Sequence, residues 1–357
     1  MAVYIQSANQ ISAQKPLSDE WFEHPVFYDQ KRVQTIDPDF TVYFQAMTAR
    51  RMCKMLKRAV VLSRQTLKEA TVEMPDAIIS GTGLGCIENT EKFMLSISEN
   101  DEKMLQPTYF MQSTHNIFSS TIAIDLKCHG YNNTFVHRGV SFENALLDAI
   151  LQFEQKRIQN ALVGGYDELT DNYYVLFDRM GWWNFQPGLP PQQSCFAGEA
   201  AANMLLSATK TELSIGEVKG IELMYKPDSE QFRQTLDKML AKAGCQLSDV
   251  DAILTGMNTN LANDAPYHDA ITHFFGELPI LHYKHLFGES FSSSALGVYV
   301  AITCLRKGQI PAFLLSDAAD FSVGNDDTAL NGVKRILFYN HYSNQSHSLI
   351  LLSSCSD

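Results

Sequence analysis

Two stretches of the chain repeat one pattern of apolar and polar positions. Residues 62–83 (LSRQTLKEATVEMPDAIISGTG) and residues 236–257 (LDKMLAKAGCQLSDVDAILTGM) each begin with apolar residues at helical spacing. A polar turn follows, and then a short apolar run, DAIIS or DAILT, that leads to a glycine. This pattern predicts an amphipathic helix that leads into a short buried strand.

A second pair of stretches shows a similar, looser likeness. Residues 149–165 (AILQFEQKRIQNALVGG) and residues 301–317 (AITCLRKGQIPAFLLSD) each predict a helix with a basic end, followed by a short apolar strand. Alternating helices and buried strands favour a layered α/β fold, and two such sets in one chain indicate a duplication. We place the join near residues 208–213, which predicts an N-terminal half over 1–210 and a C-terminal half over 211–357.

The segment around residue 139 predicts a strand, a tight turn and a helix in succession. Thr134 to Val136 suit a short buried strand, and apolar residues recur at helical spacing from Phe142 onward. In many α/β enzymes such a turn holds a nucleophile, because the free N–H groups at a helix start favour an anion. We expect Ser141 to be the N-cap of the helix.

This junction resembles the active-site segment of the β-ketoacyl synthases, which typically reads GPNxTxxTACASGxxAI. Gly130, Asn132, Thr134 and Ser141 match that pattern, whereas the catalytic cysteine of the family falls on Gly139. Other segments resemble further motifs of the family, in the same order along the chain. They are residues 49–67, 79–93, 161–171, 177–183 and 197–206.

Both catalytic histidines of the family are replaced as well. Its HGTGTxLND motif aligns with GMNTNLAND and puts Gly256 at the histidine position. Its KSxxGHxxGAAG motif aligns with KHLFGESFSSSALG, which keeps Lys284 and puts Glu289 at the histidine position. Tyr342 corresponds to the gating phenylalanine of the family. The resemblance therefore assigns no catalytic residue here, because the acyl-carrying thiolate and the donors that stabilise the enolate are missing.

Three nearby groups are candidate replacement nucleophiles, and each has a simpler structural explanation. His137 suits a loop histidine, Ser141 a helix cap and Cys128 a packed thiol. Glu289 and Lys284 suit a structural ion pair better than an acid and base pair.

The resemblance implies a thiolase-like α/β fold with duplicated halves in a layered αβαβα arrangement. It also implies a non-catalytic, chain-length-factor-like subunit that forms a heterodimer with an active β-ketoacyl synthase. Such a subunit shapes the acyl tunnel of its partner in polyketide, polyene or fatty-acid-type elongation. Within the family, the chain resembles proteins of bacterial aryl polyene and flexirubin-type pathways. The alternatives are an independent acyltransferase or hydrolase with a rebuilt site, and a purely structural partner.

Two groups of residues are candidates for contact with partners. Large apolar residues occur within 106–120, before the nucleophile turn. In this family the residues before that turn lie near the acyl tunnel of the partner, so these side chains could line the tunnel. The alternative is that they pack in the core of this chain. A basic island in an early helix suits an acidic acyl carrier protein, and a solvated helix face is the alternative. The predicted tunnel residues are Tyr109, Phe110, Met111, Ile117, Phe118 and Tyr342, and the predicted carrier contacts are Arg50, Arg51, Lys54, Lys57 and Arg58.

Composition narrows the partners further. The 357 residues carry a net charge of -12, which argues against a nucleic-acid partner. No apolar stretch approaches the roughly 20 residues that span a bilayer, and the N-terminus lacks the regions of a signal peptide, so we predict a cytoplasmic protein. The seven cysteines form no CxxC pair and suit reduced thiols. Neither they nor the ten histidines show a metal-binding spacing, so we predict no metal and no cofactor.

Overall fold

The computed structural model describes residues 2–100, 102–183, 185, 194–316 and 329–355. At its centre is a β-sheet with parallel and antiparallel strands, which is flanked by helices. The first half of the sheet has the strand order β3-β2-β4-β5-β1. Its strands β2, β3 and β4 are parallel, whereas β5 runs antiparallel to both of its neighbours. These strands are β1 (Val3–Ile11), β2 (Ala77–Gly81), β3 (Tyr131–Phe135), β4 (Asn160–Asp167) and β5 (Ala200–Ser207).

The second half of the sheet repeats this arrangement. Its order is β8-β7-β11-β12-β6, which is again third, second, fourth, fifth and first along the chain. Here too the fifth strand, β12, runs antiparallel to both neighbours. The pattern echo therefore reflects a duplicated architecture, as predicted. The strands are β6 (Gly216–Tyr225), β7 (Ala252–Thr255), β8 (Ile280–Leu281), β11 (Arg335–Tyr342) and β12 (Ser346–Ser353).

The two half-sheets join where β1 pairs with β6 through Val3–Val218, Tyr4–Glu217 and Ile5–Gly216. The result is a continuous sheet of 10 strands. The predicted division at residue 210 falls between the end of β5 and the start of β6, and it stays a prediction.

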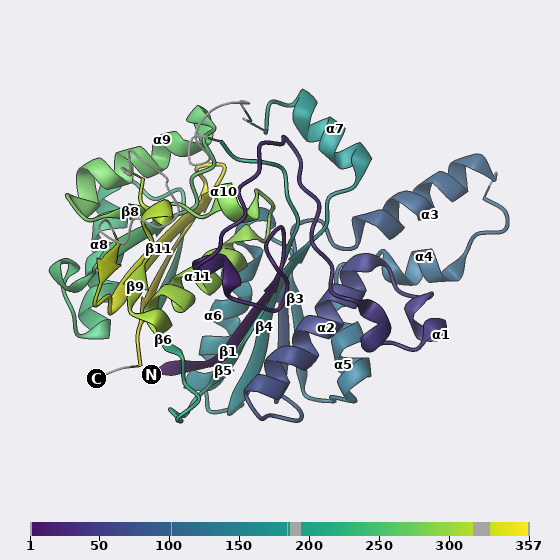
Figure 1. Ribbon diagram of the computed structural model, residues 1–357, viewed down its shortest axis with the longest axis horizontal. Coiled ribbons are helices and arrows are strands. Elements are labelled where there is room, and N and C mark those ends of the chain that lie inside the picture. Colours follow the sequence, from purple (N-terminus) through teal and green to yellow (C-terminus); the bar gives the residue numbers. More distant parts are fainter. Residues whose placement is uncertain (1, 101, 184, 186–193, 317–328, 356–357) are drawn as a thin grey trace.

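The helices lie in three layers around the half-sheets (Figure 1). Helices α6 (Ser141–Glu154) and α11 (Ser293–Lys307) lie in the middle, where their apolar residues and the inner faces of both half-sheets form one large core. Two smaller cores lie under the outer helices. With the two half-sheets, these layers give the predicted αβαβα arrangement. The outer helices are α2 (Lys54–Glu69) and α5 (Ile117–Leu126) on the first half, and α8 (Ser229–Ala243) and α9 (Leu261–Ala270) on the second.

One predicted strand is absent from the position that the sequence echo suggested. After α11, the chain forms only the two-residue strand β9 (Gln309–Ile310), which pairs with β10 (Leu330–Asn331) outside the main sheet. A 3-10 turn, Ala312–Leu314, follows Pro311. Proline has no backbone N–H to donate to a strand ladder. The counterpart of β4 in the second half is β11, which comes later in the chain.

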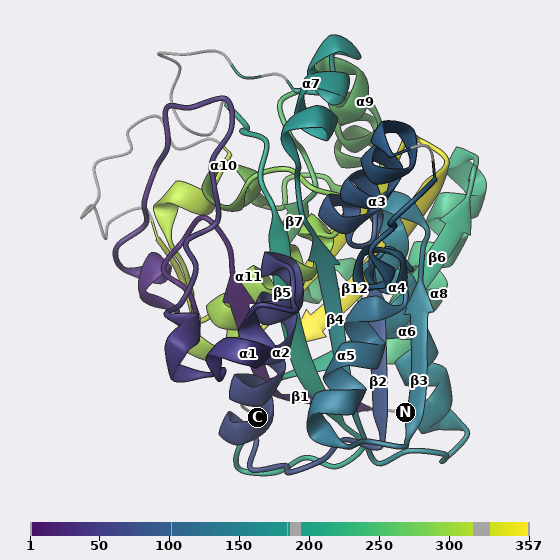
Figure 2. The same cartoon turned by 90° about the vertical axis from the view of Figure 1, so that its right-hand side faces the viewer.

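The remaining helices lie outside the three main layers or connect the strands. Figure 2 views the molecule from the side of α3 and α4, with β3 at the edge of the first half-sheet. Within the described ranges, no helix combines the length and apolar character needed to cross a membrane. The remaining helices are α1 (Ala46–Ala49), α3 (Ile87–Glu99), α4 (Pro107–Gln112), α7 (Asp171–Arg179) and α10 (Lys284–Phe287), with a π-helical turn (Ile271–Phe275) after α9 and 3-10 turns at Glu20–Phe22, Phe40–Val42, Arg138–Val140 and Leu247–Asp249.

Candidate functional site

The turn between β3 and α6 holds Gly139 at the centre of the site. The N-cap of α6 is Val140, and Ser141 is the first helical residue, so the prediction that Ser141 caps the helix is wrong. Ser141 Oγ is buried and accepts a hydrogen bond from His137 N at 2.8 Å. It also lies 2.9 Å from Thr82 O, so the hydroxyl ties the turn to the end of β2. The Ser141 hydroxyl is therefore engaged in hydrogen bonds within the protein.

An aromatic ring fills the space where a side chain on Gly139 would lie. A Cβ atom added to Gly139 would lie 2.9 Å from Cδ2 and 3.2 Å from Cβ of Tyr342. Contacts below 3.0 Å require atoms to move, because protein interiors are close-packed. Tyr342 is the last residue of β11, so the second half of the chain closes the nucleophile position of the first.

The first histidine position is also filled by neighbouring side chains. Gly256 directly follows β7, and a Cβ atom there would lie 2.4 Å from both Asn340 Oδ1 and the Tyr267 hydroxyl. The Tyr267 hydroxyl and Asn340 Oδ1 are 3.0 Å apart. Asn340 Nδ2 donates to Gly139 O at 3.0 Å. Asn340 therefore lies between two of the three replaced positions and bonds to the backbone of one of them.

The second histidine position holds a buried ion pair. Lys284 Nζ and Glu289 Oε2 are 2.7 Å apart, and both residues are buried. Asn258 Nδ2 donates to the same carboxylate oxygen at 2.7 Å. Lys284 therefore compensates the charge of Glu289, as expected for a structural ion pair. Burial, with the charge of Glu289 adding to it, raises the pKa of the nearby Cys195 thiol well above its usual range.

Behind Asn340 lies a fully buried carboxyl group, Glu143 of α6. Asn340 Nδ2 donates to Glu143 Oε1 at 2.6 Å, and Ser294 Oγ donates to Glu143 Oε2 at 2.9 Å. Burial raises the pKa of the Glu143 carboxyl, although these hydrogen bonds favour its charged form. Through these hydrogen bonds, the Glu143 carboxyl links α6, α11 and β11 beside the turn that holds Gly139.

The histidine beside this network, His341, is engaged through both ring nitrogens. His341 Nε2 lies 2.8 Å from Asn263 O, and Asn344 N donates to Nδ1 at 3.3 Å. Burial lowers the pKa of His341 to about 3, so the ring is neutral at physiological pH. It is therefore not a free substitute for either missing histidine.

Aromatic side chains cover the site from outside. Phe291 packs at ring-centroid distances of 5.8 Å from both Trp182 and Tyr342, and 5.7 Å from Phe177. Among the described residues, the cavity between this cluster and Glu289 measures about 20 Å³. Pockets that hold small molecules typically measure about 300–1,000 Å³. The described side chains therefore leave no room there for an acyl chain.

The predicted tunnel residues do not form one group. Tyr109 is half-buried on α4, whereas Phe110 and Met111 are each 58% exposed. Ile117 and Phe118 lie on α5, and Phe118 is fully buried, with its ring 5.5 Å from that of Tyr166. Tyr342 lies apart from these residues, against Gly139. The segment thus divides into an exposed part on α4 and a core part on α5.

The predicted carrier contacts also divide. Arg50 and Arg51 are exposed between α1 and α2, and Lys54 is exposed on the first turn of α2, with Lys57 half-buried. Arg58 is buried, pairs with Asp37, and has its Nη1 2.8 Å from Glu199 Oε2. The guanidinium of Arg58 is therefore occupied inside the protein, and the prediction that it contacts a carrier protein does not hold.

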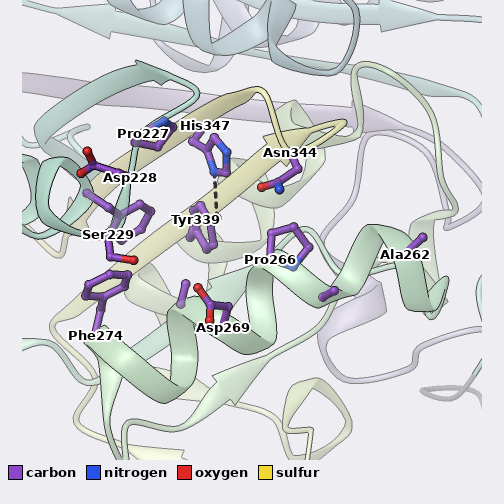
Figure 3. A pocket seen from close by; sticks show the side chains of 13 residues that line it. Pro227, Asp228, Ser229, Ala262, Pro266, Asp269, Phe274, Tyr339, Asn344 and His347 are labelled. Carbon is purple, nitrogen blue, oxygen red and sulfur yellow. Dashed lines mark hydrogen bonds between the residues drawn. The ribbon is translucent and has the colours of Figure 1, made fainter.

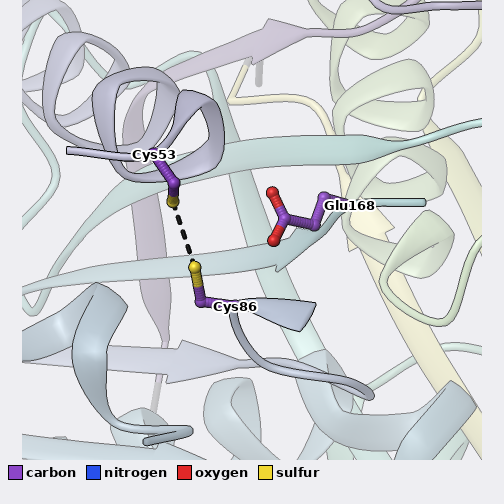
Figure 4. A group of neighbouring side chains, drawn as sticks. All are labelled: Cys53, Cys86 and Glu168. Atoms are coloured by element: carbon purple, nitrogen blue, oxygen red, sulfur yellow. Dashed lines mark hydrogen bonds between the residues drawn. The ribbon is translucent and has the colours of Figure 1, made fainter. Parts of the chain in front are cut away.

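Two features escaped the sequence analysis because they depend on residues far apart in the chain. A groove of about 460 Å³ lies beside β11 and β12, between the start of α8 and α9 (Figure 3). The Tyr339 hydroxyl and His347 Nδ1 bond across its wall at 2.9 Å, and Asp228 caps α8. The other feature is a buried cluster of Cys53, Cys86 and Glu168 (Figure 4), which the spacing of the cysteines does not reveal.

The duplicated strand order and the strand–turn–helix junction define a thiolase-type protein of the ketosynthase class, in which a glycine stands at the nucleophile position. Residues 19–256 match the family model described as β-ketoacyl synthase, N-terminal domain. The chain therefore belongs to the β-ketoacyl synthase family. A search of curated protein sequences gives no match.

Solved structures with the same fold extend over the whole chain. One described as the ishigamide ketosynthase/chain length factor has a TM-score of 0.81 at 18% identity, and covers 99% of both chains. A β-ketoacyl synthase from Burkholderia phymatum has a TM-score of 0.79 at 14% identity, over 99% of both chains. AntDE:AntF, described as a type II PKS acyl-carrier protein in complex with its ketosynthase bound to the hexaketide, has a TM-score of 0.76 at 13% identity, over 99% of both chains. These likenesses confirm the predicted thiolase-like fold.

The contact between Gly139 and Tyr342 predicts that restoring the cysteine alone is unfavourable. We expect Gly139→Cys to lower the free energy of unfolding by about 1–3 kcal/mol, the usual cost of overpacking a core. Tyr342→Ala should relieve part of this cost, so the double variant should be less destabilised than the sum of the two single variants. Urea unfolding of the four proteins measures the coupling, and additive effects would contradict the contact.

The two parts of the predicted tunnel segment should respond differently when a phenylalanine is replaced by alanine. We expect Phe118→Ala to lower the free energy of unfolding by about 3–5 kcal/mol, because it removes a buried ring. Phe110→Ala is the matched control and should change stability by less than about 0.5 kcal/mol, because its ring is mostly exposed. Chemical denaturation measures both, and equal losses would place Phe110 in the core.

Proposed function

We propose that the chain is a non-catalytic, chain-length-factor-like subunit of a heterodimeric β-ketoacyl-[acyl carrier protein] synthase. In this proposal the active partner carries the acyl thioester, and this chain completes the dimer and limits the length of the product. The fold likeness to a structure described as a ketosynthase/chain length factor supports the assignment.

The observation that carries the proposal is the state of the nucleophile position. Decarboxylative condensation in this family uses a thiolate, and here Gly139 has no side chain and Tyr342 occupies the adjacent space. Gly256 and the Lys284–Glu289 pair supply neither of the donors that would stabilise an enolate. The chain thus keeps the fold of the family but has none of the three catalytic side chains. A non-catalytic subunit would have this combination.

A sheet edge offers the surface for the partner. Within the described residues, β3 pairs only with β2, which leaves its other edge open. An open edge with apolar neighbours tends to pair with another chain unless it is covered. Exposed apolar side chains lie on and around β3, and on the helices that precede it in the chain. They are Phe110 and Met111 on α4, Ile124 on α5, and Tyr131 and Val136 at β3.

We assign this edge to the active ketosynthase. The two proteins would share one fold, so each could present the equivalent edge strand and the helices beside it. Phe110 and Met111 then lie on the surface that faces the partner, where their side chains can close the end of the partner's acyl tunnel. The volume of such side chains decides where a growing chain stops.

Co-expression with an active ketosynthase from the same genome tests the proposal. We expect the two chains to co-purify as a heterodimer, and Phe110→Ala or Met111→Ala to lengthen the product without dissociating the dimer. The reason is that a smaller side chain deepens the tunnel. Product mass and size-exclusion analysis measure the two effects.

Leu261→Ala is the control for these variants, because Leu261 is 87% exposed on the second half of the chain and should leave product length unchanged. A complex whose product length is unchanged in every α4 variant would exclude the template role and leave a structural partner. Full activity of this chain by itself would favour the alternative of an independent enzyme with a rebuilt site.

We further propose that the exposed basic residues at the start of α2 attract an acyl carrier protein. Arg50, Arg51 and Lys54 are exposed in a chain of net charge -12, so they form a local basic surface. A structure described as an acyl-carrier protein in complex with its ketosynthase shares this fold. The narrower pathway, of the aryl polyene or flexirubin type, and the cytoplasmic location remain part of this proposal.

Charge reversal tests the basic surface. We expect Arg50→Glu combined with Arg51→Glu to weaken binding of the carrier protein to the heterodimer at least about tenfold, because like charges across an interface are strongly unfavourable. The difference should shrink as salt screens it. Lys238→Glu on the exposed face of α8 is the matched control. An equal loss in the control would mean that net charge, and not this surface, governs binding.

A further inference from the structure

A buried cluster of two thiols and a carboxylate lies outside the site described above. Cys53 precedes α2, Cys86 precedes α3, and Glu168 follows β4. Their ligand atoms all lie within 4.8 Å of one another, and the two sulfur atoms are 3.0 Å apart. Figure 4 shows the carboxylate of Glu168 lying beside the pair of sulfur atoms.

The surrounding structure holds the three groups in place. Glu168 Oε1 accepts a hydrogen bond from Glu88 N, in the first turn of α3, at 2.9 Å. Asn89 Nδ2 lies 3.4 Å from Cys86 Sγ. Neither cysteine caps its own helix through its side chain. The two sulfur atoms instead point toward each other, and the groups come from three separate elements of the first half of the fold.

The charges of this cluster suit a cation. Both thiolates and the carboxylate would be negative, and all three ligand atoms are buried. A bound divalent cation would offset this negative charge.

An adjoining cavity reaches Glu168, one of the three residues of the cluster. It measures about 530 Å³, and Glu168 and Lys54 lie in its wall. Glu88, Glu91 and Glu199 line the same cavity together with Arg32 and Arg58, and carboxylates outnumber basic residues in its wall. A water molecule from this cavity can complete a coordination shell, and the carboxylates favour the approach of a cation.

We propose that Cys53, Cys86 and Glu168 bind one zinc ion, with a water molecule from the adjoining cavity in the fourth position. Thiolate ligands select zinc over magnesium or calcium, and a carboxylate oxygen is a known third ligand. A tetrahedral site with Zn–S bonds of about 2.3 Å separates two sulfur atoms by about 3.8 Å. The 3.0 Å pair therefore needs to open only slightly.

A disulfide between the two cysteines is the competing use of the pair. Reactive thiols typically have a lowered pKa, in electropositive and partly exposed surroundings. Cys86 is fully buried, and the carboxylate of Glu168 lies within 4.8 Å of its sulfur atom. These surroundings disfavour the thiolate that would attack a disulfide or peroxide, whereas a cation would stabilise it. The cluster therefore suits metal binding better than oxidation.

Such an ion would have a structural consequence. Helix α3 packs with α4, since Phe93 and Phe110 have ring centroids 5.3 Å apart. A metal bound at the start of α3 would fix that helix to α2 and to the end of β4. The site does not depend on the proposed function, although it would steady the helices that carry the exposed α4 residues.

Titration of the reduced, metal-free full-length chain with Zn²⁺ and Co²⁺ tests the proposal. We expect one metal ion per chain by elemental analysis, and an intense thiolate-to-Co²⁺ absorption band that Zn²⁺ removes. Cys86→Ser should abolish the band, and Glu168→Gln should weaken binding at least about tenfold, since even the loss of an outer partner typically costs about 10- to 100-fold. Cys128→Ser is the matched control, because that thiol is also buried but bonds to Pro75 O.

Several results would overturn the proposal. One is a metal content below one ion per chain with no cobalt–thiolate band. Another is an unchanged band in Cys53→Ser or Cys86→Ser. A third is a Cys53–Cys86 disulfide recovered by peptide mapping of freshly purified protein. If a serine variant fails to fold, Glu168→Gln, which keeps the size of the side chain, still decides whether the carboxylate is a ligand.

Discussion

The burial of α6 and α11 between two half-sheets is the constraint on which the rest of the structure depends. Every residue of α11 from Ser293 to Leu305 is buried, so the helix has no face turned to water. Close approach then requires small residues: a Cβ atom on Gly165 would lie 2.8 Å from Ala295 Cβ, and one on Gly297 would lie 2.7 Å from the ring of Phe338. At the start of α6, a Cβ atom on Gly81 would lie 2.5 Å from Phe142 N, so the first turn of α6 packs directly against the end of β2.

The same burial decides how polar groups at the site must be arranged. A buried charge is tolerated only with partners, and breaking a buried pair typically costs about 3–5 kcal/mol. Lys284 supplies that partner for Glu289, and Asn340 and Ser294 bond to Glu143. These bonds use the polar groups around Gly139, Gly256 and Glu289 within the protein itself. This arrangement supports the non-catalytic role that we propose.

Local patterns in the sequence predicted most of the fold, whereas contacts across the duplication could not be predicted. The helix and strand around residues 62–83 depend on neighbours in the chain, and the structure confirms them as α2 and β2. The contacts of Tyr342 and Asn340 with Gly139 join residues more than half a chain apart. Alignment placed Tyr342 near the site, but not in the space of the missing side chain. The sequence predicts Arg58 as part of an exposed basic face, because the pairing with Asp37 and Glu199 forms only in the folded chain.

The central claim is that this chain shapes a product without ever carrying it. Incubating the co-purified heterodimer with acylated carrier protein, and mapping the acyl group by mass spectrometry of peptides from both chains, tests that claim most directly. The account predicts an acyl thioester on the catalytic cysteine of the partner and none on this chain. An acyl adduct on Ser141, Cys128 or any other residue of this chain, retained when the partner's cysteine is replaced by alanine, would contradict it.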